Sequence, residues 1–294
     1  MKKTILVFLV CLICKQISFS QVSGNAVYSN QNNQYRLDLN TSKTQLVGNT
    51  GILVSGNVLM NVPADYYIAI IGASEEAVTP PKAYQKLNRR IKNFNNKLKA
   101  VGIPADNIYI DATTQNRVYE HFLQGNYIEE KVTGFEVKKN IHIRYERPEQ
   151  LEEILIKAAD EGIYDLVKVD YVVEDVEKIY DQLFEEAMKT IEKKRDRYLQ
   201  LMNYTARKHP FLHGEQMNIV YPKDAYRKYQ AFSSTNWSQT SINKNRYPVK
   251  TARKMETFYF SKVDPVGFDK VINRGALEPP VQFILHLQIR YDFE

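Results

Sequence analysis

The order of strand and helix patterns constrains the fold of this chain more than any other feature of its sequence. Alternating or continuous apolar runs predict strands at residues 52–62, 66–72, 107–120, 128–146 and 166–173. Apolar residues at helical spacing predict helices at residues 79–101, 148–161 and 175–204. Further strand-like runs follow at residues 255–263 and 280–294. This order predicts an α+β fold, a mostly antiparallel sheet with long helices packed on it.

The first predicted helix has the clearest boundaries. Thr79 is the expected N-cap, Pro80 takes the first helical position, and Gly102 follows the last turn. A single stripe carries the apolar side chains of Tyr84, Leu87, Ile91, Phe94, Leu98 and Val101. We therefore expect Ile91 and Phe94 in the hydrophobic core. The basic side chains fall outside the stripe, and we expect a solvated face that carries Lys86, Arg89, Arg90, Lys92, Lys97 and Lys99.

Glycines and side-chain alternation refine the predicted strands. Gly56 interrupts the first strand, which predicts a β-bulge there. Gly125 and Asn126 separate the two longest strand-like runs, which predicts an antiparallel hairpin. In the last strand, apolar residues from Val281 to Phe293 alternate with polar ones. That alternation predicts a strand with one face buried and the other in water.

The N-terminal residues have the pattern of an export signal. Lys2 and Lys3 precede an apolar run, and Ser18-Phe19-Ser20 fits a small-x-small cleavage site before Gln21. The apolar run is too short to remain as a membrane-spanning helix. The predicted organisation is a signal peptide at residues 1–20, an N-terminal arm at 21–50 and one main domain at 51–294. We expect the mature protein in the periplasm, either soluble or held at the outer membrane.

The cysteines and the charge narrow the chemistry further. Cys11 and Cys14 are the only cysteines and both lie in the predicted signal, so the mature chain forms no disulfide and no cysteine metal site. The formal net charge is +6, but the basic excess is local, since residues 207–254 carry ten basic and two acidic side chains. A local positive field suits an acidic protein surface or an anionic membrane. An exported protein is not expected to bind nucleic acid.

We find no residue pattern that is typical of an active site. Gly-x-Ser-x-Gly, phosphate-binding loop and dinucleotide fingerprints are absent from the sequence. His209 and His213 are four residues apart, like a metal-binding pair on a helix, but Pro210 lies between them and no acidic third ligand is near in sequence. We therefore expect no enzyme activity, no cofactor and no bound metal.

Several short segments resemble the SIMPL family in their order and spacing. They are Val54-Ser55-Gly56, Val62-Pro63-Ala64-Asp65, the stretch from Leu98 to Ile108, Gly134-Phe135, and Ala158-Ala159-Asp160-Glu161-Gly162. The resemblance covers residues 51–206 well and the rest loosely. It implies a periplasmic or outer-membrane-associated protein that tends to self-assemble. The family has no agreed catalytic residues, and some members are linked to envelope or oxidative stress.

The basic segment at residues 223–254 is the predicted binding site, because it combines cationic and aromatic side chains of the types that anchor interfaces. The candidate partner-binding residues are Arg227, Lys228, Tyr229, Phe232, Trp237, Arg246, Tyr247, Lys250, Arg253 and Lys254. We expect this segment to dock on a partner subunit or on the anionic membrane surface. A solvated loop is the alternative. The predicted function is a non-enzymatic envelope scaffold or partner-binding subunit that can form homo-oligomers. The alternative function is a small-ligand or metal-handling protein of envelope or oxidative stress.

Overall fold

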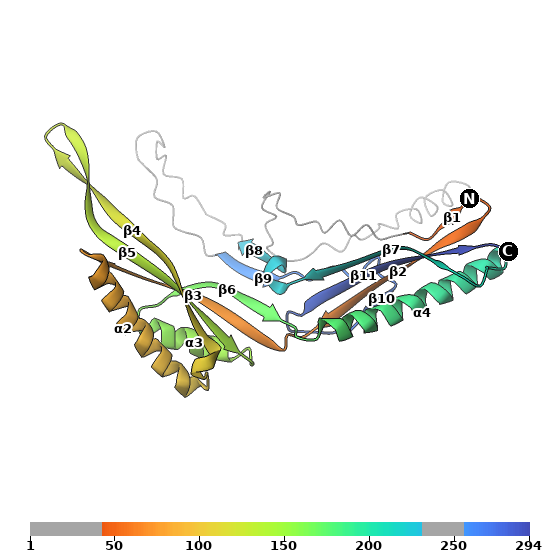
Figure 1. Cartoon of the computed structure of the whole chain (residues 1–294), viewed down its shortest axis with the longest axis horizontal. Helices are drawn as coiled ribbons and strands as arrows, with labels where there is room; N and C mark the ends of the chain where they lie inside the picture. The colour runs from red at the N-terminus through yellow and green to blue at the C-terminus, as the bar shows by residue number, and fades with distance from the viewer. Residues whose placement is uncertain (1–42, 231–255) are drawn as a thin grey trace, which may run out of the picture. The chain divides into compact units, whose positions relative to one another are not determined.

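The computed structural model describes residues 43–230 and 256–294 (Figure 1). The predicted signal peptide, the predicted N-terminal segment from residue 21 to residue 42, and residues 231–255 lie outside the described ranges. The strands are β1 Gln45–Val47, β2 Gly51–Val62, β3 Tyr66–Ala77, β4 Ile108–Gln124, β5 Tyr127–Tyr145, β6 Asp165–Val172, β7 Phe211–Val220, β8 Tyr226–Gln230, β9 Glu256–Phe260, β10 Lys270–Ile272 and β11 Val281–Asp292. The helices are α2 Pro80–Leu98, α3 Gln150–Ala159, α4 Val176–Met202 and α5 Pro222–Ala225, with 3₁₀ turns η1 Lys99–Val101 and η2 Ala105–Asn107.

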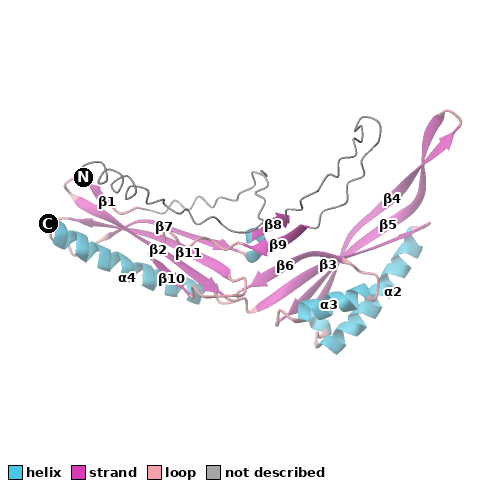
Figure 2. Ribbon diagram, turned by 180° about the vertical axis from the view of Figure 1, so that it is seen from behind, coloured by secondary structure: helices cyan, strands magenta, loops and turns pink. Residues whose placement is uncertain are grey.

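These elements confirm the predicted order and the α+β class. Figure 2 shows the helices packed against sheets whose strands run mostly antiparallel. Thr79 is the N-cap of α2, and Gly102 adopts a left-handed conformation with φ of 79° after η1. Asp175 caps α4, because its side chain accepts a hydrogen bond from the backbone N–H of Lys178. The helix boundaries therefore follow the residues that favour helix ends in the sequence.

The first sheet has the strand order β1-β2-β11-β7, and β10 pairs with β2 in parallel. One face of this sheet packs against α4, which buries Ile179, Leu183, Ala187 and Ile191. The predicted bulge at Gly56 is wrong, since β2 pairs with β11 without a register shift. Gly56 instead lies under α4, where a Cβ atom would come within 2.8 Å of the Ala187 carbonyl oxygen. The glycine allows close packing of helix and sheet.

The opposite face of β11 also differs from its prediction. The polar residues of this strand were expected in water, yet Gln282 and His286 are buried. β11 is a central strand, between β2 and β7, so its polar side chains bond across to β2. The Gln282 amide donates to Asn61 Oδ1 at 2.9 Å, and His286 Nδ1 lies 2.8 Å from Asn57 Oδ1. Cross-strand hydrogen bonds satisfy most of this polar row and offset the cost of its burial.

His286 makes folding stability depend on pH. Its Nε2 is buried without a hydrogen-bond partner in the described ranges, and burial lowers the pKa of His286 below the ordinary value of 6.5. The unfolded chain therefore takes up a proton at a higher pH than the folded chain. The contribution of neutral His286 to the free energy of unfolding is therefore fully present above about pH 6.5. It is lost as the pH falls through the pKa that His286 has in the folded chain.

We predict that the urea midpoint of the wild type falls between pH 7.5 and pH 5 more steeply than that of His286→Gln. Glutamine is the matched control because it can also bond Asn57 but does not titrate. Equal slopes for the two proteins would contradict the assignment of this pH dependence to His286.

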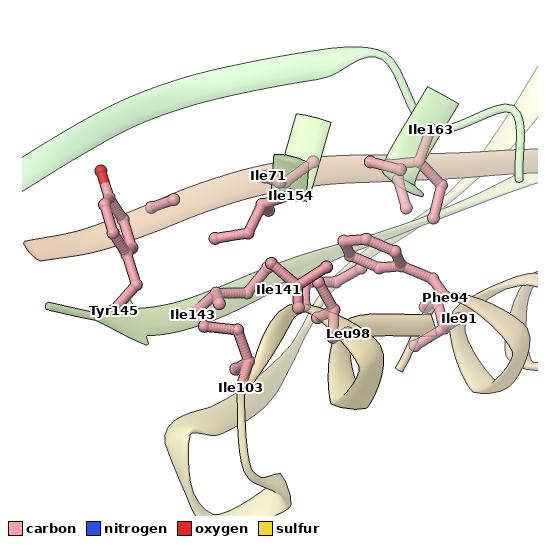
Figure 3. Packing of buried hydrophobic residues seen from close by; sticks show 14 of the residues in the cluster. Ile71, Ile91, Phe94, Leu98, Ile103, Ile141, Ile143, Tyr145, Ile154 and Ile163 are labelled. Carbon is pink, nitrogen blue, oxygen red and sulfur yellow. The ribbon is translucent and has the colours of Figure 1, made fainter. Parts of the chain in front are cut away.

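The second sheet has the strand order β4-β5-β3-β6, and all its pairs are antiparallel. Helices α2 and α3 pack against one face and enclose a core around Phe94 (Figure 3). As predicted, Ile91 and Phe94 are buried. Inward residues of β3 and β5 complete the core, including Ile71, Ile141 and Ile143.

Arg90 corrects the expected solvated face of α2. Its guanidinium donates to the backbone carbonyls of Ser74, Glu161 and Gly162 and bonds Glu75 Oε2 at 2.6 Å. These partners come from the end of β3 and from the turn after α3. Arg90 therefore connects α2 to β3 and to the turn after α3. Its neighbour Arg89 is exposed as expected.

Residue contacts divide the described residues into two compact units, the first with 227–230 and 256–259 and the second with 43–226 and 260–294. Both sheets above belong to the second unit. In the first unit, the described residues belong to β8 and β9, which pair as a two-stranded sheet. The predicted irregular segment at 223–254 therefore begins with ordered structure, since α5 and β8 occupy residues 222–230. Short alternating stretches such as Tyr226–Gln230 are difficult to separate from loops by pattern alone.

Candidate functional site

The hairpin of β4 and β5 is longer than the strand that supports it. The last pair between β3 and β5 joins Ala77 to Phe135, whereas β4 and β5 continue to pair as far as Gln124 and Tyr127. Beyond β3, residues 118–134 form a two-stranded ribbon with no further strand beside it in the described ranges; we call it the arm (Figure 1). An isolated two-stranded ribbon has little stability of its own in water.

Local sequence explains how the arm forms and where it begins. Gly125, with φ of 60°, provides the left-handed conformation that the tight turn requires. At the base, Thr133 has no direct partner in the register, which shifts between Val118 and Tyr119. Such a bulge bends and twists a ribbon. Gly134 fits close to β3, because a Cβ atom there would lie 3.1 Å from the Ala77 carbonyl oxygen.

One face of the arm is mostly apolar and exposed. Directly opposed residues share a face, so Tyr119 with Val132 and Leu123 with Ile128 lie on the same side of the ribbon. Leu123 is 78% exposed and Ile128 is 67% exposed. We call Tyr119, Leu123, Ile128 and Val132 the apolar face of the arm. Exposed β-branched and aromatic residues on an unsupported ribbon are a typical site of association with another protein.

Charged residues accompany the apolar face. His121 Nε2 lies 3.9 Å from Glu130 Oε1, between the two apolar pairs, and Lys131 Nζ lies 3.0 Å from Glu129 Oε2. All four side chains are exposed, so these pairs contribute little to stability. The arm carries three glutamates and one lysine in total. Its field therefore favours a partner surface with a neutral or basic rim.

The structure describes little of the binding site that the sequence predicts. Arg227, Lys228 and Tyr229 lie on β8, and the remaining candidates, Phe232, Trp237, Arg246, Tyr247, Lys250, Arg253 and Lys254, lie outside the described ranges. The prediction for this segment therefore stays a prediction. The arm was not predicted as a site, although Leu123 and Ile128 flank the Gly125 turn, where polar residues are usual.

His209 and His213 do not form a pair on a helix. His209 precedes β7 and His213 lies within it, in extended chain. Across the described ranges, no group of three or more histidine, cysteine, aspartate or glutamate side chains could hold a metal ion. Across the same residues, no helix is long and apolar enough to cross a membrane.

Comparison with known proteins identifies a family. The family model for SIMPL, described as a protein of unknown function (DUF541), matches residues 52–251. It begins within one residue of the resemblance seen in the sequence and extends beyond residue 206, so the predicted family is confirmed. A search of the curated proteins finds no match.

Proposed function

The chain belongs to the SIMPL family, and from this premise we propose that it is a non-enzymatic binding protein of the cell envelope. It acts as a scaffold or partner-binding subunit, and its partner is another envelope protein or a second copy of the chain. The signal-like residues 1–20 support export to the periplasm. The apolar face of the arm is the observation that carries the proposal.

The energetics of the arm favour a bound state. Full burial of an aliphatic side chain contributes about 1.5–3 kcal/mol, and Leu123 and Ile128 both keep most of their surface in water. The outer edge of β4 has no strand beside it in the described ranges, so its backbone N–H and C=O groups are open to a partner strand. A partner that covers this ribbon gains apolar contact and backbone hydrogen bonds together.

The basic segment at residues 223–254 provides a second proposed contact. Its charge favours an acidic protein surface or the anionic membrane surface, and it supports association with the outer membrane. The two contacts have opposite electrostatic preferences, since the arm is acidic and this segment is basic. A protein with two such surfaces can join two different components, as a scaffold requires.

Replacing Leu123 and Ile128 together with serine should remove partner binding and leave the fold intact. Both side chains are exposed, so we expect the free energy of unfolding to change by less than about 0.5 kcal/mol. Affinity purification of the tagged chain from membrane extracts, followed by mass spectrometry, measures the loss of partners. Light scattering of the purified chain measures loss of self-assembly.

The matched control is Leu201→Ser, because Leu201 is also highly exposed but lies on α4. This variant should keep all partners. If the double arm variant retrieves the same partners in the same yield and keeps the same mass in solution, the arm is not the interface.

A further inference from the structure

A pocket lies between α2 and β4, on the helix-covered face of the second sheet. Its volume is about 440 Å³, within the range of small-molecule sites. It is separate from the arm and lies at the other end of the hairpin. The lining includes Lys92, Asn95, Lys99, Ile108, Ile110 and Lys139.

The lining combines cations and amides with an apolar floor. Lys92 comes from α2, Lys99 from η1 and Lys139 from β5. Ile108 and Ile110 of β4 provide apolar surface between them. No lining residue carries a carboxylate. The helix side and the sheet side of the pocket therefore each contribute both cationic and apolar side chains.

Lys139 occupies a position where the strand pattern calls for an apolar side chain. Val137, Ile141 and Ile143 of β5 point into the core under α2 and α3, and Lys139 shares their face because residues two apart do so in a strand. Its Nζ donates to Asn88 Oδ1 at 2.8 Å. The Lys139 side chain therefore lines the pocket, and its hydrogen bond to Asn88 stays exposed to solvent.

Among the residues that the structure describes, the pocket lysines lack the ion pairs that three other cations of α2 make. Lys86 and Arg90 pair with Glu75, and Lys97 pairs with Asp160 and Glu161. In the described ranges, Lys92, Lys99 and Lys139 form no ion pair with a carboxylate. Positive potential therefore persists on the pocket side of the helix, where an anion can use it.

Asn95 adds a polar group that lacks a partner. Its Oδ1 is buried and has no hydrogen bond within the described ranges. A buried polar atom without a partner is costly, and a ligand that bonds to it removes that cost. Because an amide offers both an acceptor and donors, Asn95 can bond a ligand hydroxyl or, with its amide turned over, a ligand oxygen.

We propose that this pocket binds a small organic anion. Lysines of the lining pair with its carboxylate, sulfonate or phosphate group, and its apolar body rests on the isoleucines. This site goes beyond the partner-binding function and does not depend on it. Charge-assisted hydrogen bonds from the lysines provide affinity, and the apolar floor selects against small inorganic ions.

Isothermal titration of the mature chain with naphthalene-2-sulfonate tests the site, since this probe joins one anionic group to an apolar body. We expect saturable binding to one site, and Lys99→Gln should weaken it by about tenfold or more. Lys99 is the first choice because its exposed side chain supports no other described element. The matched control is Lys193→Gln, an exposed lysine of α4, which should bind the probe as the wild type does.

Two further titrations test separately whether the anionic group and the apolar body of the ligand are both needed for binding. Neutral 2-naphthol and inorganic phosphate should each bind at least about tenfold more weakly than the sulfonate. Lys139→Gln should weaken sulfonate binding as well, with the thermal midpoint measured to show that the variant is folded. No saturable binding by the wild type, unchanged affinity in folded Lys99→Gln and Lys139→Gln, or equal affinity for 2-naphthol would each overturn the anion site.

Discussion

Replacing Phe94 with alanine should lower the free energy of unfolding by about 3–5 kcal/mol. Phe94 is 0% exposed, and its ring lies among side chains of α2, α3 and the second sheet (Figure 3). The substitution removes apolar contacts and leaves a cavity that a sheet flanked by two helices cannot easily close. Urea denaturation followed by circular dichroism measures the loss.

Phe122→Ala is the matched control for this prediction. Phe122 lies on the arm, is 40% exposed and takes no part in the described cores, so its truncation should change stability by less than about 1 kcal/mol. A loss at Phe94 as small as that at Phe122 would mean that the inner face of α2 has been misassigned.

Replacing Arg90 with methionine should cost about 2–4 kcal/mol of unfolding free energy. Methionine keeps much of the aliphatic volume but leaves the carbonyls of Ser74, Glu161 and Gly162 without their shared donor. It also leaves Glu75 without its shortest ion pair. Lysine should recover only part of the loss, since an ammonium cannot span the same set of acceptors.

Arg89→Met provides the control, because Arg89 is adjacent in sequence and exposed. Its unfolding free energy should stay within about 0.5 kcal/mol of the wild type. If Arg90→Met and Arg89→Met have equal thermal and urea midpoints, the bonds of Arg90 contribute nothing to the fold.

The sequence predicts the helices and strands of this fold better than it predicts which side chains are buried or bonded by distant segments. Helix ends at Thr79, Gly102 and Asp175 follow from local chemistry, and the structure confirms them. The burial of His286 does not follow from β11 alone, because the opposite face of that strand is covered by distant residues such as Phe268. Arg90 was placed in solvent for the same reason, since its acceptors lie far away in the chain.

The two candidate sites, the arm and the pocket, also depend on contacts between distant segments. The hairpin was predicted from Gly125, but only the end of β3 at Ala77 shows that residues 118–134 lack support. Strand length cannot be compared between partners before the register is known. For the pocket, the signal in the sequence is Lys139 within an apolar register, and recognising it requires the inward face of β5 to be known.

The central claim is that the apolar face of the arm binds a protein, and photo-crosslinking tests it most directly. Benzoylphenylalanine at position 123, in the chain expressed in its native cells, should yield a discrete adduct on irradiation. Mass spectrometry of that adduct identifies either a second copy or another envelope protein. The same probe at Tyr164, which is 75% exposed in the turn before β6, should yield no discrete adduct. If position 123 gives no adduct, or gives the same products as position 164, the arm is not a binding surface.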